Sequence, residues 1–318
     1  MRVSEEFRYE TPIRFRLDVL REVVQEVSGD ASATVTAKNN ITKLYERLSG
    51  QTCFAENPDE FLGRMEGHAK GNTCRVYYAP SYTQAPRAAR KAIVPVGEGN
   101  RFVYLDIKSA EYILNSYFAG DKGTISAYEE GEDVYLLYSK YFPEGSSRKV
   151  MKEALIGGMY GLTSFTLSKR LGCSEREAKG LLSLIVYYRK ESTQLNNYII
   201  STVKNVGWYV CPNGFDDEDL VKVAPVDFSD RKWVNRAFSI YTQSALGLWM
   251  QSRIRLLQEK LGESSTLIQV FDSLLFEVPK GAEEEQVINE IKELVSPFRV
   301  EVGFGDNFYE AQMSAKSV

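Results

Sequence analysis

The spacing of apolar positions predicts a chain built from several helices and a few separated strands. Apolar residues recur at helical intervals over residues 13–28. From Ser147 to about Tyr198 the pattern is almost wholly helical, with breaks near Gly161 and Gly172. Further helices are expected at about 39–49, 109–120, 235–262 and 283–298.

Strand-like patterns occur at three places that lie far apart in the sequence. Residues 101–107 and 299–308 each predict one strand, and residues 266–279 predict a hairpin. Residues 207–215 predict a further hairpin with an Asn-Gly turn. Because a long helical block separates the strands, the simplest assembly is a small sheet with a helical insertion, which is α+β in class.

Composition narrows the class of protein. The chain has 318 residues and is 43% hydrophobic, which suggests about two domains or lobes. Its apolar runs fall far short of the ~18 residues of a membrane span, and its start lacks the apolar core of a signal peptide. The four cysteines (Cys53, Cys74, Cys173 and Cys211) form no CxxC pair, and His68 is the single histidine. We therefore expect free thiols in a cytoplasmic protein, no zinc site and no histidine-based catalysis.

The charge balance does not by itself indicate a nucleic-acid-binding protein. The formal charge is −4, from 39 basic and 43 acidic residues. Local patches matter more than the sum, and basic residues cluster at 87–91, 146–152, 167–170 and 230–236.

Two aspartates stand at the ends of predicted strands. Asp272 lies in the stretch QVFDSLLFEV, residues 269–278, where on its own it is typical of a hairpin turn. Asp106 ends the strand at 101–107, directly before a helix. If these strands pair, both carboxylates project from one edge of one sheet and can hold two Mg²⁺ ions for an in-line displacement at phosphorus. Two unrelated turn or cap residues are the alternative.

The segment RKVMKEALIGGMYG, residues 148–161, carries a stripe of functional side chains. Arg148, Lys152, Ile156 and Tyr160 are spaced by four residues, so on a helix each step drifts by ~40° and the set spans ~120°. Two cations one turn apart suit a triphosphate, and the apolar and aromatic members suit a sugar or a base. A solvated basic turn that runs into core residues is the alternative.

These three elements, in this order, resemble motifs A, B and C of the family A DNA polymerases. LDIKSAEY matches motif A with Asp106 and Glu111, and QVFDSLLFEV is similar to the QVHDELVFEV of motif C. Motif B is matched by Arg148, Lys152, Ile156, Gly157, Tyr160 and Gly161. Residues 73–86, the predicted hairpin, the long helix and the ending RVEVGFGDNFYEAQ also resemble family segments, so the resemblance spans about 73–318 in collinear order.

The resemblance implies a right-hand polymerase fold with a small antiparallel palm sheet, a helical fingers insertion and a short helical N-terminal region. The implied domains are a helical region at 1–72, interpreted as a reduced thumb, then palm (73–145), fingers (146–229) and palm (230–318). No acidic exonuclease pattern is visible in residues 1–72, so we expect synthesis without proofreading. A small thumb predicts low processivity, unless a partner protein supplies the clamp.

The resemblance also assigns roles to residues. Asp106, Asp272 and the backbone carbonyl of Ile107 would hold two Mg²⁺ ions, for which Mn²⁺ could substitute. Arg148 and Lys152 would bind the triphosphate, and Lys152 would assist the leaving pyrophosphate. The remaining nucleotide contacts would be Ile156, Tyr160, Tyr135 and Glu111, which stands where a steric gate against the ribose 2′-hydroxyl is expected. The DNA contacts would be Arg75, Gln84, Gly161, Gln243 and Arg236.

Several positions depart from the family pattern. Phe271 and Ser273 stand where His and Glu are usual, Ile156 replaces an aromatic residue, and Tyr135 and Asn235 replace His and Arg. The Asp-Ser pair resembles motif C of phage-type RNA polymerases, whereas Glu111 argues against that reading. The leading hypothesis is a DNA polymerase acting on primer–template DNA and deoxynucleoside triphosphates. An RNA polymerase or primase-like enzyme and an inactive protein that binds nucleic acid or a replication partner remain as alternatives.

Overall fold

The computed structural model describes residues 1–4, 6–50, 57, 59–69, 73–79, 87–215, 219–262 and 264–318. The chain divides into two compact units. The helical unit comprises Met1–Ser4, Gly71–Cys74 and Ser109–Trp249, and the sheet unit comprises Glu5–Lys70, Arg75–Lys108 and Met250–Val318. These boundaries differ from the expected domain boundaries at 145/146 and 229/230, because the helices that directly follow Lys108 pack with the helical block.

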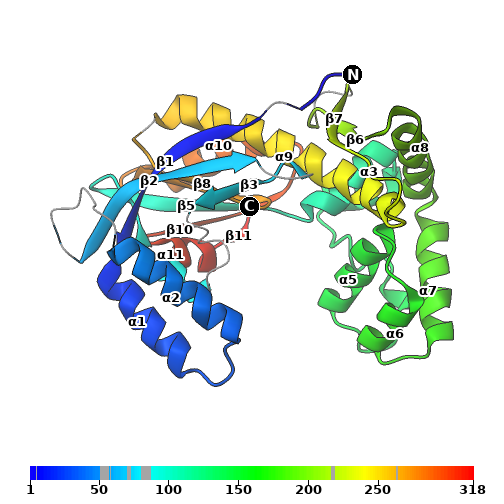
Figure 1. The fold of residues 1–318 in the computed structure, drawn as a ribbon, viewed down its shortest axis with the longest axis horizontal. Coiled ribbons are helices and arrows are strands. Elements are labelled where there is room, and N and C mark those ends of the chain that lie inside the picture. Colours follow the sequence, from blue (N-terminus) through cyan, green and yellow to red (C-terminus); the bar gives the residue numbers. More distant parts are fainter. Residues whose placement is uncertain are drawn as a thin grey trace. The chain divides into compact units, whose positions relative to one another are not determined.

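A five-stranded antiparallel sheet forms the core of the sheet unit, in the order β11-β10-β5-β9-β8. Its strands are β5 (Asn100–Ile107), β8 (Leu267–Val270), β9 (Ser273–Pro279), β10 (Val300–Gly305) and β11 (Lys316–Ser317). The predicted pairing of the three distant strand segments is therefore confirmed. Helix α11 (Phe308–Met313) packs on β5 and β10, and α10 (Glu284–Val295) connects β9 to β10 (Figure 1).

A second sheet, with the order β3-β2-β1-β4, corrects the expectation of a helical N-terminal region. Its strands are β1 (Arg8–Arg16), β2 (Glu60–Ala69), β3 (Val76–Ala79) and β4 (Ile93–Val94). In β1 the buried residues Tyr9, Thr11, Ile13 and Phe15 follow the period of two that a strand requires. Helix α1 (Leu17–Gly29) therefore starts four residues later than predicted, and α2 spans Val35–Ser49.

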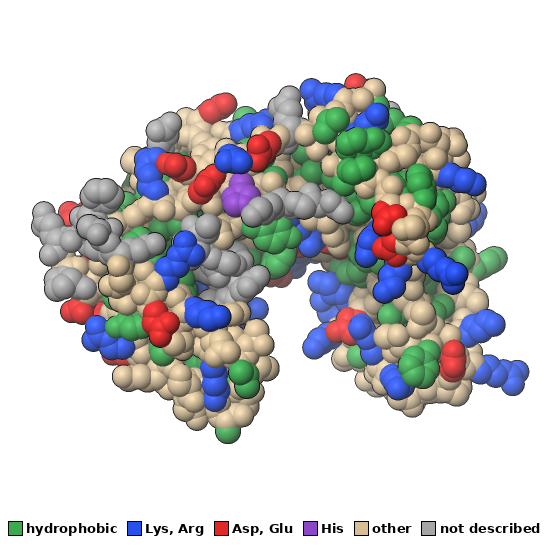
Figure 2. Space-filling model, in the orientation of Figure 1, with side chains coloured by type: hydrophobic (Ala, Val, Ile, Leu, Met, Phe, Trp, Pro, Cys, Tyr) green, Lys and Arg blue, Asp and Glu red, His purple; other side chains and the backbone are tan. Residues whose placement is uncertain are grey.

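The outward face of β1 and β2 carries paired charges. Arg64 donates to Glu10 at 3.1 Å, and Arg14 pairs with Glu60 at 2.6 Å. Acidic and basic side chains lie side by side over this part of the surface (Figure 2). The half-buried His68 sits in β2 opposite Arg8. The Arg64–Glu10 pair is exposed and therefore contributes little to stability, whereas the Arg14–Glu60 pair is partly buried.

The helical unit contains the expected run of helices. They are α3 (Ala110–Ala119), α4 (Lys122–Glu129), α5 (Arg148–Met159), α6 (Ser164–Leu171), α7 (Glu175–Tyr188), α8 (Lys190–Val206) and the first part of α9 (Trp233–Leu261). Hydroxyl side chains of Ser147, Thr163 and Ser174 cap the starts of α5, α6 and α7. In the described part of the chain, short 3₁₀ segments occupy Arg87–Ala92 in the sheet unit and Ser139–Tyr141 in this unit. The breaks predicted near Gly161 and Gly172 are confirmed, and both glycines have positive φ.

The hairpin predicted around residues 207–215 exists, but its turn is not the predicted Asn-Gly pair. Strand β6 (Trp208–Pro212) pairs with β7 (Leu220–Pro225), and Pro212 lies opposite Leu220. Gly214 instead has a φ of 96° and packs against the backbone of Trp249. Within the described ranges, Cys74, Cys173 and Cys211 are free thiols. None of the helices described combines the length and apolar composition that a membrane span needs.

Candidate metal and nucleotide sites

The two predicted metal-binding aspartates lie at the same end of neighbouring strands in the sheet unit. Asp106 is opposite Ser273, the first residue of β9, and Asp272 directly precedes Ser273 in the β8–β9 turn. The backbone N–H of Ile107 donates to the carbonyl oxygen of Asp272 at 3.1 Å. The sequence predicted that both carboxylates lie at one edge of the sheet if their strands pair, and the strands do pair.

The turn that carries Asp272 is tight and strained. Phe271 and Asp272 are its two central residues, because Val270 and Ser273 pair across the hairpin. Phe271 has a φ of 58°, which bulky residues rarely adopt and which costs of order 1–3 kcal/mol. Ser273 donates through its hydroxyl to the carbonyl of Val270 at 2.7 Å, and Gln269 donates through Nε2 to the carbonyl of Phe271 at 2.8 Å. These two bonds hold the turn in its strained conformation.

The ring of Phe271 is accessible, and a predicted DNA contact lies over it. Phe271 is 55% exposed, unlike the residues on either side of the turn. The guanidinium of Arg75 lies 5.4 Å from the centre of this ring. A cation at this distance is attracted by the ring face. The structure thus joins Arg75 to Phe271, one of the two motif C positions that depart from the family pattern.

Sequence reasoning missed a phenol that contacts Asp106. Tyr104 donates through its hydroxyl to Oδ1 of Asp106 at 3.2 Å, and the side-chain amide of Gln312 donates to the same hydroxyl at 3.5 Å. Burial, followed by the nearby charge of Asp106, raises the pKa of Tyr104 to about 12. The phenol therefore stays protonated and able to donate. The clue in the sequence was the spacing, because residues i and i+2 of a strand share a face.

The donor set around Asp106 fits a magnesium ion that also binds substrate. Across the described residues, no group of three or more His, Cys, Asp or Glu side chains could hold a metal ion. Mg²⁺ usually takes one or two carboxylates, keeps several waters and shares substrate phosphates rather than using an all-protein cage. Asp106 and Asp272 supply two such carboxylates, while the role of the Ile107 carbonyl stays a prediction.

In the helical unit, the two predicted phosphate-binding cations share one aromatic ring. The guanidinium of Arg148 lies 5.1 Å, and Nζ of Lys152 lies 5.5 Å, from the centre of the Tyr135 ring. Tyr135 is only 1% exposed and packs edge-on against Tyr112. Arg148 also forms an ion pair with Asp133. The ring of Tyr135 thus backs both cations, which differs from the direct phosphate contact that the resemblance implied for it.

The last member of the predicted stripe meets the predicted sugar gate. Tyr160 forms the C-terminal cap of α5, and its hydroxyl donates to Oε2 of Glu111 at 3.0 Å. Glu111 lies in the first turn of α3. The ring of Tyr160 also packs edge-on against Phe238 of α9, while Ile156 is half-buried one turn earlier. The sequence placed Tyr160 and Glu111 in separate motifs and gave no sign of this bond.

The predicted DNA contacts are dispersed. Gly161 has a φ of 82°, and a Cβ atom there would lie 2.9 Å from the side chain of Asn235. Arg236 is exposed and pairs with Asp230 at 2.6 Å, and Gln243 is half-buried on α9. Gln84 lies outside the described residues.

Comparison with known proteins finds relatives among the DNA polymerases. The family model for DNA polymerase family A matches residues 78–209. DNA polymerase I of Chloroflexus aurantiacus is 25% identical over an alignment that covers 92% of this chain. The chain is therefore similar to members of DNA polymerase family A. DNA polymerase I of Borreliella burgdorferi is 26% identical over 68% of the chain.

The chain spans only part of the relatives it matches. It aligns with 34% of the C. aurantiacus protein and 24% of the B. burgdorferi protein. A solved polymerase domain of Pol1 from M. smegmatis, in complex with DNA primer-template and dNTP, superposes with a TM-score of 0.66 at 20% identity. That match covers 93% of this chain and 56% of the other, which establishes a shared α+β polymerase fold.

Proposed function

We propose that this chain is a template-directed DNA polymerase that adds deoxynucleotides to the 3′-hydroxyl of a primer. The observation that carries the proposal is the pairing of β5 with β9, because it brings Asp106 and Asp272 to one strand end in a chain similar to members of this family. Primer–template DNA and deoxynucleoside triphosphates are the proposed substrates. The carboxylates belong to the sheet unit and the nucleotide-binding cations to the helical unit.

Asp106 and Asp272, with the Ile107 carbonyl, would hold the proposed cofactor, two Mg²⁺ ions. When bound, these ions would supply charge stabilisation for the displacement at phosphorus. Tyr104 keeps Asp106 oriented through its hydrogen bond. Arg148 and Lys152 bind the triphosphate as charge-assisted donors, and Lys152 donates toward the leaving pyrophosphate. The buried ring of Tyr135 is proposed to support both cations, which lie within cation–π distance of it.

Glu111 is the proposed gate against ribonucleotides. Its carboxylate accepts a hydrogen bond from the Tyr160 hydroxyl at 3.0 Å, which restricts the side chain to one orientation. Ile156 and the Tyr160 ring are proposed to contact the sugar and base. Arg75, Gln84, Gly161, Gln243 and Arg236 are the proposed DNA contacts. Low processivity and a clamp-supplying partner remain predictions of the same proposal.

The buried Ser273 weakens the RNA polymerase alternative. That alternative rested on the Asp-Ser pair, but Ser273 is 2% exposed and its hydroxyl bonds the Val270 carbonyl. A side chain committed to closing the turn is not available to a nucleotide. We therefore attribute Ser273 to the geometry of the hairpin and not to selection of the sugar.

A primer-extension assay tests the proposal. The wild-type chain, with Mg²⁺, a labelled primer–template and deoxy- or ribonucleotides in separate reactions, should extend the primer with deoxynucleotides. Asp106→Ala and Asp272→Ala should abolish extension while DNA binding is retained. Asp306→Ala, which removes an exposed ion pair with Lys280 in the same unit, is the matched control and should extend normally.

Three results would argue against the proposal. Preferential use of ribonucleotides, or synthesis without a primer, would favour the RNA polymerase or primase-like alternative. Extension that survives both aspartate substitutions would exclude the proposed metal site. A wild type that binds DNA but extends no primer with either sugar would favour the inactive binding protein.

A further inference from the structure

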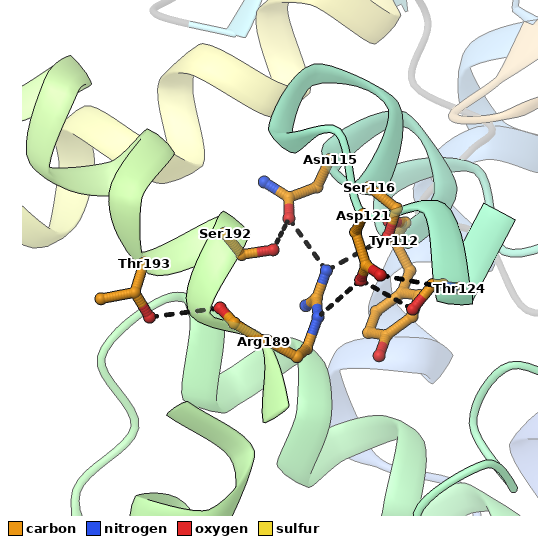
Figure 3. A network of polar contacts seen from close by, with 8 residues as sticks. All are labelled: Tyr112, Asn115, Ser116, Asp121, Thr124, Arg189, Ser192 and Thr193. Atoms are coloured by element: carbon orange, nitrogen blue, oxygen red, sulfur yellow. Dashed lines mark hydrogen bonds and ion pairs between the residues drawn. The ribbon is translucent and has the colours of Figure 1, made fainter. Parts of the chain in front are cut away.

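A single buried arginine connects several helices of the helical unit. Arg189 lies between α7 and α8 and is 2% exposed. Its guanidinium contacts Asn115 Oδ1 at 3.0 Å, Ser116 Oγ at 3.3 Å, Asp121 Oδ2 at 3.9 Å and the Tyr112 ring at 4.1 Å (Figure 3). Three of these partners lie on α3, and the fourth caps the start of α4.

Neighbouring bonds extend the network. Ser192 of α8 donates through its hydroxyl to Asn115 Oδ1 at 2.8 Å, so this oxygen receives two donors (Figure 3). Asp121 accepts from the backbone N–H of Thr124 at 3.1 Å and from its hydroxyl at 2.7 Å. The α3–α4 corner is thereby tied to the α7–α8 corner by directional bonds as well as by packing.

The network holds the helix that carries Glu111. Asn115 follows Glu111 by four residues, so the two side chains leave α3 about 40° apart and one turn along. Arg189 also lines a cavity of about 130 Å³ together with Gly158, Met159 and Phe238. Gly158 and Met159 end α5 next to Tyr160, and Phe238 touches the Tyr160 ring. Arg189 therefore lies beside both elements that supply the Tyr160–Glu111 hydrogen bond.

We propose that Arg189 is a positioning residue for sugar selection, which holds α3 where Glu111 can accept the hydrogen bond of Tyr160. The inference rests on the proposed function, because Glu111 selects a sugar only if the chain uses nucleotides. A buried ion pair is a costly way to pack helices, and apolar residues of similar volume often do so at least as well. However, Nη2 of Arg189 donates to two consecutive residues of α3, Asn115 and Ser116, and the planar guanidinium thereby constrains the rotation of α3 as well as its distance.

Arg189→Lys is the discriminating variant. The variant retains a cation near Asp121 but loses the guanidinium Nη2, which donates to both Asn115 and Ser116. Arg170→Lys is the matched control, because Arg170 forms an exposed pair with Glu153 in the same unit. The readout is the ratio of kcat/KM for a deoxynucleotide to that for the matching ribonucleotide, measured by single-nucleotide primer extension. Hydrogen exchange of residues 110–116 reports on α3 independently of activity.

We expect Arg189→Lys to lower the sugar ratio about threefold to tenfold, the loss that follows from weakening one hydrogen bond. Exchange of residues 110–116 should become faster, and Arg170→Lys should leave both readouts unchanged. Tyr160→Phe should lower the ratio in the same direction. The double variant should be no worse than Tyr160→Phe alone, because both changes break the same bond.

A merely structural role for Arg189 gives a different result. Arg189→Lys would then reduce kcat/KM for both sugars equally, and its effect would multiply with that of Tyr160→Phe. Either outcome, in an active wild type, overturns the positioning role and leaves the proposed function intact. A wild type that extends no primer refutes both. If Arg189→Lys fails to fold, Ser116→Ala provides the test, since it removes one of the two hydrogen bonds that Arg189 donates to α3.

Discussion

Replacing Tyr104 by phenylalanine removes one buried oxygen atom from the strand that carries Asp106. The change deletes the hydrogen bond to Oδ1 of Asp106 and leaves the ring in its packing against Phe308. Because Tyr104 is only 6% exposed, its phenol ionises with difficulty in the folded chain. The variant therefore isolates how strongly this group couples folding to pH.

The size of the effect follows from the pKa of the Tyr104 phenol. Burial, and then the charge of Asp106, raise that pKa from 10.0 to about 12. A raised pKa means that the folded state binds the proton more tightly, so the stabilisation is fully present below pH 10 and is lost as the pH rises through 12. At about 1.36 kcal/mol per pKa unit the total loss is roughly 2–3 kcal/mol, of which about half is lost by pH 11.

The assay is urea unfolding of wild type and Tyr104→Phe at pH 9 and pH 11, followed by circular dichroism. Between these pH values the wild type should lose about 1 kcal/mol more unfolding free energy than the variant does. Tyr77→Phe, at a 41% exposed position of the same unit, controls for the titration of an ordinary phenol. A difference between wild type and Tyr104→Phe that stays constant with pH would refute the reasoning.

Three further predictions concern other contacts. Glu277→Gln should lower the unfolding free energy by about 2–4 kcal/mol in urea unfolding, and an unchanged midpoint would contradict this. Each carboxylate oxygen of Glu277 accepts two N–H donors, so the NH₂ group of a glutamine would face two other donors. Gly161→Ala should lower the unfolding free energy by at least about 1–2 kcal/mol because of the positive φ at this position. Adding Asn235→Ala should recover only the part of this loss that comes from the clash with Asn235, as measured by thermal unfolding. Asp133→Asn should lower the KM for deoxynucleotides up to about fivefold, because the Asp133–Arg148 ion pair, worth at most ~1 kcal/mol, competes with the nucleotide for Arg148. A raised KM in steady-state extension would show that Asp133 instead orients Arg148.

The sequence located the candidate site but not its supporting contacts. Asp106 and Asp272 were predictable because each lies at the end of a strand whose apolar pattern is strong, and because the hairpin turn is a local feature. Glu111 and Tyr160 were also singled out, yet their hydrogen bond joins residues 49 positions apart. Tyr104 was overlooked because a tyrosine in a strand is ordinary and its partner Gln312 is 208 positions away.

Errors arose where two periods fitted the same residues. Ile13 and Phe15 begin a segment that satisfies the helical spacing of 13–28, and only the pairing of β1 with β2 decides that the chain is extended there. The turn after Pro212 was misplaced because Asn-Gly favours a two-residue hairpin turn, whereas Asn213 itself bonds the carbonyl of Asp219 and Pro212 pairs with Leu220. Non-local contacts override local preference in the first case.

By itself, the sequence determined the antiparallel strands that bear the carboxylates, the cationic stripe on α5 and the resemblance to DNA polymerase family A. Those features depend on local periodicity and on residue types at short spacing. Only the tertiary structure decided that Tyr135 lies beneath two cations, that Ser273 closes its turn, and that Arg189 links α3 to α8. Each of these depends on which side chains meet across elements distant in sequence, and such meetings are fixed by close packing of the whole unit rather than by any local pattern.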